Sequence, residues 1–157
     1  MPWIAMGNFY HQGQVCAAGT RVVVHESIAD QVVEGLAEFA RSSVVGDPFD
    51  PASTQGTIVS RRQFDRIMGY IDAGRAEGAD LVTGGGRVGD RGYFIEPTVF
   101  RGDNSLTIAR EEIFGPVATV ITFSDTDEAV RIANDTPYGL NAFILSLIHI
   151  SEPTRPY

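Results

Sequence analysis

The sequence contains a single cysteine, Cys16, in a chain of 157 residues. One thiol cannot form a disulfide bond within the chain, so a disulfide-stabilised scaffold is excluded and we expect a reducing, cytoplasmic setting. Histidine is scarce as well, at three residues. Three scattered histidines and one cysteine lack the spacing of a metal site, and we expect no bound metal.

Basic residues are also few. The 12 lysine and arginine residues are outnumbered by 20 acidic residues, which gives a formal net charge of −8. Nucleic acids and anionic membrane surfaces require a basic footprint, so we expect neither as a partner. A bound nucleotide cofactor is not excluded, because it needs only a local electropositive site.

Long apolar segments are also absent. No apolar run is long enough to cross a bilayer, and the residues after Met1 lack the basic flank and apolar core of a signal peptide. Hydrophobic residues make up 43% of the chain and charged residues 20%, as in ordinary soluble globular proteins. This length predicts one domain that buries roughly two-thirds of its unfolded surface.

Short β-branched or alternating runs predict the strands. They lie at residues 21–25, 81–83, 93–100 and 117–123, and a further extended segment begins at Leu140. Pro97 denies the third of these strands one ladder hydrogen bond.

Apolar residues at helical spacing predict helices between the strands. One helix is expected to begin at Ser27 with an apolar face that includes Ile28, and a second at Ser60, where Gln63 completes a capping-box pattern. A third helix is expected after Asp125 or Thr126. Strands that alternate with helices predict a parallel α/β layer fold.

Cys16 is the main candidate for chemistry. Gly13, Ala17, Ala18 and Gly19 leave room for a carbonyl group to approach its sulfur. A free cysteine has a pKa of about 8.5, so an active site must lower that value or supply a base. An isolated cysteine is also a common buried, small hydrophobic residue, so the residues alone leave both readings open.

Three other features are weaker candidates. His11 lies too close to Cys16 in sequence for a typical Cys–His catalytic pair. The Gly84–Gly86 run follows neither phosphate-loop pattern and predicts a plain turn. Glu111 and Glu112 are adjacent and do not face one another on a helix, so taken alone they predict solvated charge.

Two longer patterns are more specific. We call the first the Cys16 run: Phe9-x-x-x-Gly13-Gln14-x-Cys16-Ala17-Ala18-Gly19-Thr20. We call the second the Glu112 block: Arg110-Glu111-Glu112-Ile113-Phe114-Gly115-Pro116-Val117. Three further segments lie between or after them: Val45-Gly46-Asp47-Pro48, Gly92-Tyr93-Phe94-Ile95-Glu96-Pro97-Thr98 and Asn134-x-x-x-Tyr138-Gly139-Leu140.

In their order along the chain, the five segments resemble those of the NAD(P)-dependent aldehyde dehydrogenase superfamily, from about Asn8 to Ile144. The resemblance implies the parallel-sheet catalytic (thiol) domain of that family, incomplete and without the Rossmann-like cofactor domain. It assigns residues 1–144 to that partial domain.

The resemblance also implies a mechanism. Cys16 would attack a small-molecule aldehyde to give a thiohemiacetal, hydride transfer would leave a thioester, and hydrolysis would give a carboxylic acid. Glu112 would hold the nicotinamide-side ribose of NAD or NADP, and Phe114 would pack beside the nicotinamide ring. The full-length protein would be a homo-oligomer.

The family's oxyanion-binding asparagine, its general-base glutamate and its glycine-rich cofactor loop precede the cysteine by more residues than this chain has. We therefore expect the isolated chain to be inactive. Residues 145–157 resemble the translation of a sequencing adapter, and we expect them to be a non-native tail.

Two alternatives stay open. One is a cysteine acyltransferase or esterase that uses Cys16 without a nicotinamide, which leaves the Glu112 block without a role. The other is a non-catalytic structural domain in which Cys16 is merely buried.

Overall fold

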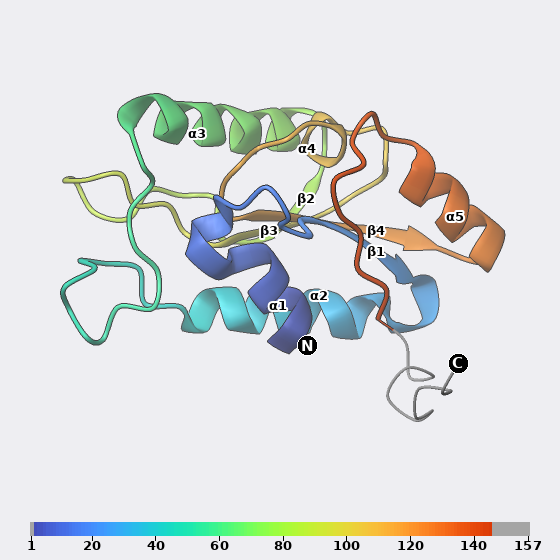
Figure 1. Ribbon diagram of the computed structural model, residues 1–157, viewed down its shortest axis with the longest axis horizontal. Helices are drawn as coiled ribbons and strands as arrows, with labels where there is room; N and C mark the ends of the chain where they lie inside the picture. The colour runs from blue at the N-terminus through green and yellow to red at the C-terminus, as the bar shows by residue number, and fades with distance from the viewer. Residues whose placement is uncertain (1, 146–157) are drawn as a thin grey trace.

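A computed structural model describes residues 2–145 of the chain. Its centre is a four-stranded sheet in the order β1-β4-β3-β2 (Figure 1). β4 pairs in parallel with both β1 and β3, whereas β2 runs antiparallel to β3. The strands are β1 (Arg21–His25), β2 (Asp80–Thr83), β3 (Thr98–Arg101) and β4 (Val117–Phe123). The sheet is therefore mostly parallel, as predicted.

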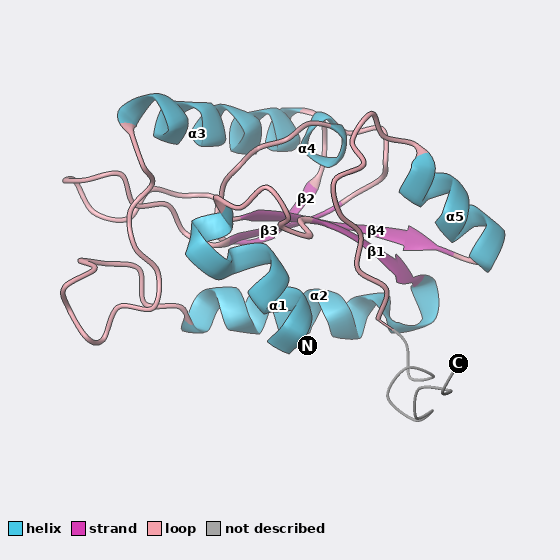
Figure 2. Cartoon of the chain, viewed as in Figure 1, coloured by secondary structure: helices cyan, strands magenta, loops and turns pink. Residues whose placement is uncertain are grey.

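Helices cover both faces of this sheet, which gives three layers (Figure 2). α1 and α2 lie on one face, and α3, α4 and α5 lie on the other (Figure 1). The helices are α1 (Pro2–Phe9), α2 (Ala29–Ser42), α3 (Arg61–Ala76), α4 (Thr107–Arg110) and α5 (Thr126–Asn134). Short 3-10 turns at Tyr10–Gly13 and Glu26–Ile28 follow α1 and β1.

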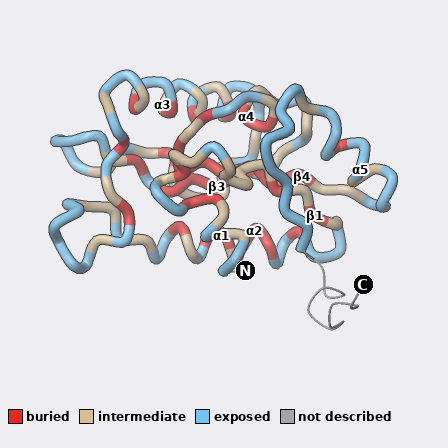
Figure 3. Tube along the Cα trace, viewed as in Figure 1, coloured by how far each residue is buried: buried red, intermediate tan, exposed pale blue. Residues whose placement is uncertain are grey.

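β4 shows how one strand serves both layers. Successive side chains of a strand point to opposite faces. Val117 and Ile121 accordingly pack into the core beneath α3, whereas Ala118 and Val120 pack into the core beneath α2. All four are almost fully buried, and the burial map places these cores on the two sides of the sheet (Figure 3). A strand buried on both faces is typical of a parallel α/β layer fold.

The predicted strands agree with the structure, with three differences. The third extended run forms a strand only from Thr98 onward, because Pro97 has no N–H to donate to the ladder. β2 is antiparallel because residues 84–97 return directly to β3 without a helix, and their only pairing is an isolated bridge between Arg87 and Ile95. Residues 140–145 form no strand.

Two of the three predicted helix starts are confirmed. The Ser60 side chain accepts a hydrogen bond from the backbone N–H of Gln63 at 3.2 Å. The Asp125 carboxylate accepts one from the N–H of Glu128 at 2.9 Å. Each side chain satisfies one of the unpaired N–H groups that every helix leaves at its start.

The predicted start at Ser27 is wrong. Ser27 lies inside the 3-10 turn, and its N–H donates to the imidazole Nδ1 of His25 at 3.1 Å. α2 begins two residues later, at Ala29, and Ile28 is half exposed rather than part of the apolar face. The His25 side chain therefore caps the 3-10 turn, and Ser27 is a residue within that turn.

The parallel pairing of β1 with β4 positions the two motifs. The Cys16 run leads directly into β1, and the Glu112 block leads directly into β4. Because neighbouring parallel strands begin at the same edge of a sheet, these two entering loops lie close together.

Three sequence expectations concern absences or the tail. No helix among the described residues is long and apolar enough to cross a bilayer. Within the same residues, no group of three or more potential ligand side chains is placed to hold a metal ion. The segment interpreted as a non-native tail lies outside the described residues, apart from Leu145.

Candidate active site

The Cys16 run and the Glu112 block meet at two glycines. Gly13 has a left-handed backbone, with φ +65°, and a Cβ atom there would collide with the carbonyl oxygen of Gly115. Only glycine tolerates both this conformation and this close approach without strain. Two patterns far apart in the sequence therefore lie side by side in one candidate site.

α3 fixes the other side of the block. A Cβ atom at Gly115 would lie 2.5 Å from Cδ1 of Ile67, which is fully buried on α3. The amide of Gln63 donates to the carbonyl oxygens of Ile113 and Phe114, at 2.9 and 3.0 Å. The predicted reciprocal half of the capping box is replaced by these two bonds, which tie the first turn of α3 to the block.

Cys16 lies in a tight turn at the surface. The N–H of Ala18 donates to the carbonyl oxygen of Val15 at 3.0 Å, and Cys16 itself is exposed. The Gln14 side chain anchors this loop because its Oε1 accepts from the N–H of Val59 at 3.0 Å. An exposed thiol contradicts the interpretation of Cys16 as a buried small hydrophobic residue.

His11 does not act as a partner of Cys16. No hydrogen bond joins the two side chains within residues 2–145, and the His11 ring instead packs edge-on against Tyr10 at 4.2 Å between centroids. Its backbone is left-handed, with φ +49°, and its carbonyl oxygen accepts from the N–H of Gln14 at 3.1 Å. These contacts are those of a residue that shapes the loop.

The two adjacent glutamates have different surroundings. The Glu111 carboxylate accepts a hydrogen bond from the Tyr70 hydroxyl at 2.7 Å, and burial together with this bond raises the pKa of Tyr70. The Glu112 carboxylate makes no hydrogen bond or ion pair within the described part of the chain. Its peptide group is held instead: Arg66 donates to its carbonyl oxygen at 2.7 Å, and its N–H donates to the Tyr138 hydroxyl at 3.3 Å.

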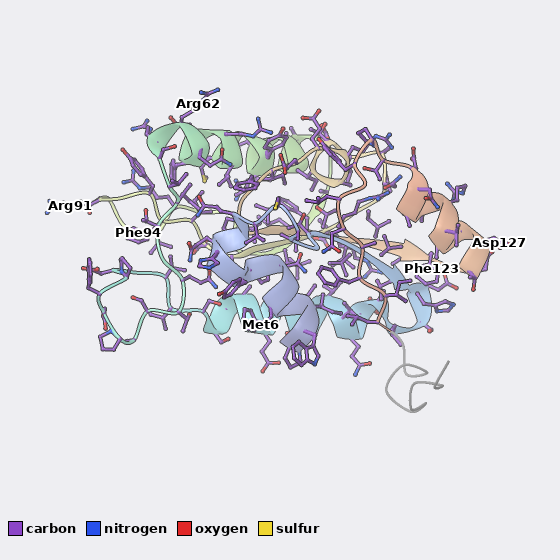
Figure 4. The ribbon with its side chains drawn as sticks, in the orientation of Figure 1. Met6, Arg62, Arg91, Phe94, Phe123 and Asp127 are labelled. Atoms are coloured by element: carbon purple, nitrogen blue, oxygen red, sulfur yellow. The ribbon has the colours of Figure 1, made fainter. Side chains whose placement is uncertain are left out.

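An open groove of about 670 Å³ brings Glu112 and Phe114 together. Its remaining lining comes from the start of α3: Val59, Ser60, Arg62, Gln63 and Arg66. Arg62 projects away from the helix into solvent (Figure 4). A free carboxylate beside an aromatic ring, in a groove that two arginines also line, is suited to a polar ligand that bears hydroxyl groups and negative charge.

The glycine-rich turn is structural. Its polar groups are engaged by neighbouring side chains: Gly85 N–H donates to Thr98 Oγ1 at 2.9 Å and Gly86 N–H to the Glu96 carboxylate at 3.0 Å. The Gly85 carbonyl oxygen accepts from Arg75 at 2.7 Å. These N–H groups already have acceptors, which supports the predicted turn rather than a phosphate loop.

Sequence reasoning missed the residues that hold the site in place. The sequence indicates Gln63 only as part of a cap, gives no signal for Arg66, and contains Tyr138 only within a family-like motif of unknown role. Their contacts join segments far apart in the sequence, so no local spacing could reveal them. The position of Tyr138 in a family-like segment was the single available signal.

Comparison with known proteins identifies the family. The model of the aldehyde dehydrogenase family matches residues 1–149. A betaine aldehyde dehydrogenase from Brucella anthropi is 50% identical over 146 residues, which covers 90% of this chain and 30% of that protein.

Solved structures give the same result. The NAD+ complex of an aldehyde dehydrogenase from Bacillus cereus superposes with a TM-score of 0.85 at 40% identity, over 87% of this chain and 28% of that one. A point mutant of betaine aldehyde dehydrogenase from Staphylococcus aureus, solved with NAD+ and a BME-modified cysteine, has a TM-score of 0.83 at 40% identity, over 87% and 29%.

The chain thus spans less than a third of the length of these relatives. Its three-layer fold and the match along almost its whole length place it in a single family. The chain belongs to the aldehyde dehydrogenase family.

Proposed function

We propose that the protein of which this chain forms part oxidises an aldehyde to a carboxylic acid with NAD+ or NADP+, with Cys16 as the nucleophile. The contact between Gly13 and Gly115 carries the proposal, because it joins the exposed thiol to the groove that holds Glu112 and Phe114. The NAD+ complexes of two family members support this choice of cofactor.

The Cys16 sulfur would form a bond to the aldehyde carbon, and the carbonyl oxygen would become an oxyanion. The backbone N–H of Cys16 is a donor for that oxyanion, and losing one such donor typically costs about 10²–10³ in rate. The carbon would then lose its hydrogen with both bonding electrons, which re-forms the carbonyl group as a thioester. Water would add to the thioester, the carbon–sulfur bond would break, and the acid and the thiol would be released.

Glu112 and Phe114 would hold the dinucleotide, which supplies the hydride acceptor when bound. The Glu112 carboxylate fits this role because it is exposed and has no partner within residues 2–145, so both oxygens can accept from ribose hydroxyl groups. Phe114 has a half-buried ring in the same groove, which suits packing against a planar ring.

We also propose that residues 1–144 are a partial catalytic domain and that the isolated chain is inactive. The chain covers 30% of the Brucella relative. The asparagine, the glutamate and the glycine-rich loop that the family resemblance implies would have to come from the rest of the protein. Purified chain, mixed with aldehyde and NAD+ or NADP+, should produce no absorbance at 340 nm above that of a Cys16→Ser control.

The complete protein provides the positive test, once the full open reading frame is recovered. We expect aldehyde-dependent NAD(P)+ reduction that the Cys16→Ser substitution abolishes. Glu112→Gln should raise the KM for the dinucleotide, while Glu34→Gln, in an exposed glutamate on α2, serves as the matched control.

Two results would contradict this function. Thioester turnover that ignores added dinucleotide would favour the cysteine acyltransferase or esterase. A wild-type rate in the Cys16→Ser variant would remove the nucleophile from the mechanism.

Residues 145–157, the cytoplasmic location and the homo-oligomeric state stay predictions. Codons that differ from the adapter across residues 145–157 would contradict a non-native tail. Size-exclusion chromatography of the complete protein tests the oligomer, and fractionation of the source cells tests the location.

A further inference from the structure

The segment from Tyr138 to Phe143 contacts both halves of the candidate site. After α5 the chain crosses in front of the sheet, and it passes beside the loop that carries Cys16 (Figure 1). The first three residues of this segment belong to a family-like motif to which the proposed chemistry assigns no role.

The upper end of the segment is held against the Glu112 block. Asp135 forms an ion pair with Arg110 at 2.8 Å, and this bond lowers the pKa of Asp135. Three residues further on, the Tyr138 hydroxyl accepts the N–H of Glu112 at 3.3 Å. The Glu112 carbonyl oxygen accepts a hydrogen bond from Arg66. Both polar groups of the Glu112 backbone are therefore bound, while its carboxylate stays free.

The lower end is held against the Cys16 loop. The Asn141 amide donates to the carbonyl oxygen of Ala17 at 3.2 Å, one residue after the nucleophile. The Phe143 ring lies against Gly19, where a Cβ atom would meet it at 3.4 Å. Residues 141 and 143 therefore run alongside residues 17 and 19 in the same direction.

We propose that residues 138–143 form a positioning strap that connects the Glu112 peptide to the Cys16 turn and holds the two in one fixed arrangement. Tyr138 and Asn141 are its two polar anchors, and neither touches the reacting atoms. The consequence for cofactor binding rests on the proposed function, whereas the strap itself rests on these contacts.

Amide hydrogen exchange of the 157-residue chain tests the strap without substrate or cofactor. Two amides report on its ends: Glu112 N–H, which is bound to Tyr138, and Ala18 N–H, which closes the Cys16 turn. A lost hydrogen bond changes a local opening equilibrium by about fivefold. Tyr138→Phe should speed exchange at Glu112 by about that factor, and Asn141→Ala should do so at Ala18.

The crossed effects decide between a strap and two separate contacts. A strap that is released at one end loosens the other, so Tyr138→Phe should also speed exchange at Ala18, and Asn141→Ala at Glu112. If each variant affects only its own end, or neither end, the proposal is overturned. If Asn141→Ala fails to fold, Asn141→Asp, which has the same size but no donor, replaces it.

Matched controls come from the same chain. Tyr93→Phe removes a hydroxyl that forms no hydrogen bond within the described residues. Asn134→Ala removes an amide that donates to Val130 at 2.8 Å, away from the site. Both controls should leave exchange at Glu112 and Ala18 within about twofold of wild type.

The complete enzyme adds a kinetic measurement. Tyr138→Phe should raise the KM for NAD(P)+ by about fivefold and leave kcat at saturating dinucleotide nearly unchanged, because only the placement of Glu112 is loosened. Equal losses in kcat and kcat/KM would overturn this positioning role. If the wild-type protein reduces no NAD(P)+, the proposed function fails while the exchange result still decides the strap.

Discussion

Phe114 has a left-handed backbone, with φ +59°, which is unusual for a bulky side chain. Such a conformation costs on the order of 1–3 kcal/mol and persists where neighbouring groups impose it. Here the two hydrogen bonds from Gln63 hold the carbonyl oxygens of Ile113 and Phe114, before and after the Phe114 Cα atom. The Phe114 side chain lines the groove in which we place the cofactor.

Two glycine substitutions should have opposite effects on stability. Gly13→Ala should lower the free energy of unfolding by about 1–3 kcal/mol, because it combines a left-handed backbone with a collision at Gly115. Gly69→Ala, in the exposed middle of α3 with open space around it, should raise the free energy by about 0.5–1 kcal/mol. Urea denaturation of both variants measures the difference. A Gly13→Ala variant as stable as wild type would contradict the close approach of the two motifs.

At the scale of elements, α3 supports the candidate site through its contacts with the Glu112 block. Its buried Ile67 limits the block at Gly115, and its first-turn Gln63 bonds to the same block. A helix whose apolar face packs into a core is a rigid support, since its backbone hydrogen bonds are internal. The precision of the groove therefore depends on where α3 begins, which the Ser60 cap fixes.

Removal of the Gln63 amide should loosen this support. Gln63→Met keeps the length of the side chain but loses both bonds to the block. It should lower the free energy of unfolding by about 1–3 kcal/mol and raise the KM for NAD(P)+ in the complete enzyme. Gln31→Met, on the exposed face of α2, is the control. Equal stabilities of the two variants in urea would show that the Gln63 bonds contribute little.

Local patterns predicted the elements whose causes are local. The caps at Ser60 and Asp125 and the β-branched strands 21–25 and 117–123 depend on neighbours within a few residues, and they were found correctly. α1 is not predicted by the sequence pattern, because its apolar and polar residues are not segregated on two faces of the helix. Gly7 and Asn8 also interrupt its run of apolar residues. Contacts with other segments determine which of its residues are buried, namely Ala5, Asn8 and Phe9.

The candidate site also contains some residues that the sequence indicates and others that only the structure reveals. Cys16, Glu112 and Phe114 were identified by resemblance, and the structure brings their two segments together. The contacts that position them, from Arg66, Tyr138 and Asn141, link residues that are far apart in sequence. Only the three-dimensional arrangement reveals such pairs.

For the whole molecule, several carboxylates make the fold sensitive to acid. Hydrogen bonds from Arg110 lower the pKa of Asp135, and bonds from Thr107 and Ser124 lower those of Glu77 and Glu128. A pKa that is lower in the folded state than in the unfolded state contributes stability above the unfolded value, which is about 4. That contribution is lost as the pH falls from about 5 through the folded pKa values.

Asp135→Asn should therefore flatten the pH dependence of stability. The wild-type free energy of unfolding should fall more steeply below about pH 5 than that of the variant, because only the wild type must protonate this carboxylate. Asp80→Asn, an exposed aspartate on β2 for which the described residues provide no ion pair, should keep the wild-type slope. Thermal melts between pH 3 and pH 7 compare the three proteins, and parallel curves for wild type and Asp135→Asn would count against the Arg110 pair.

During translation, the contact between Gly13 and Gly115 forms only after Gly115 has been synthesised. A ribosome adds roughly 5–20 residues per second, so Gly115 emerges about 5–20 s after Gly13. Until then the loop that bears the chain's single thiol lacks the surface that shapes it. While the residues between the two glycines are synthesised, Cys16 therefore lies in an unassembled loop, and the candidate site forms only after Gly115 has emerged.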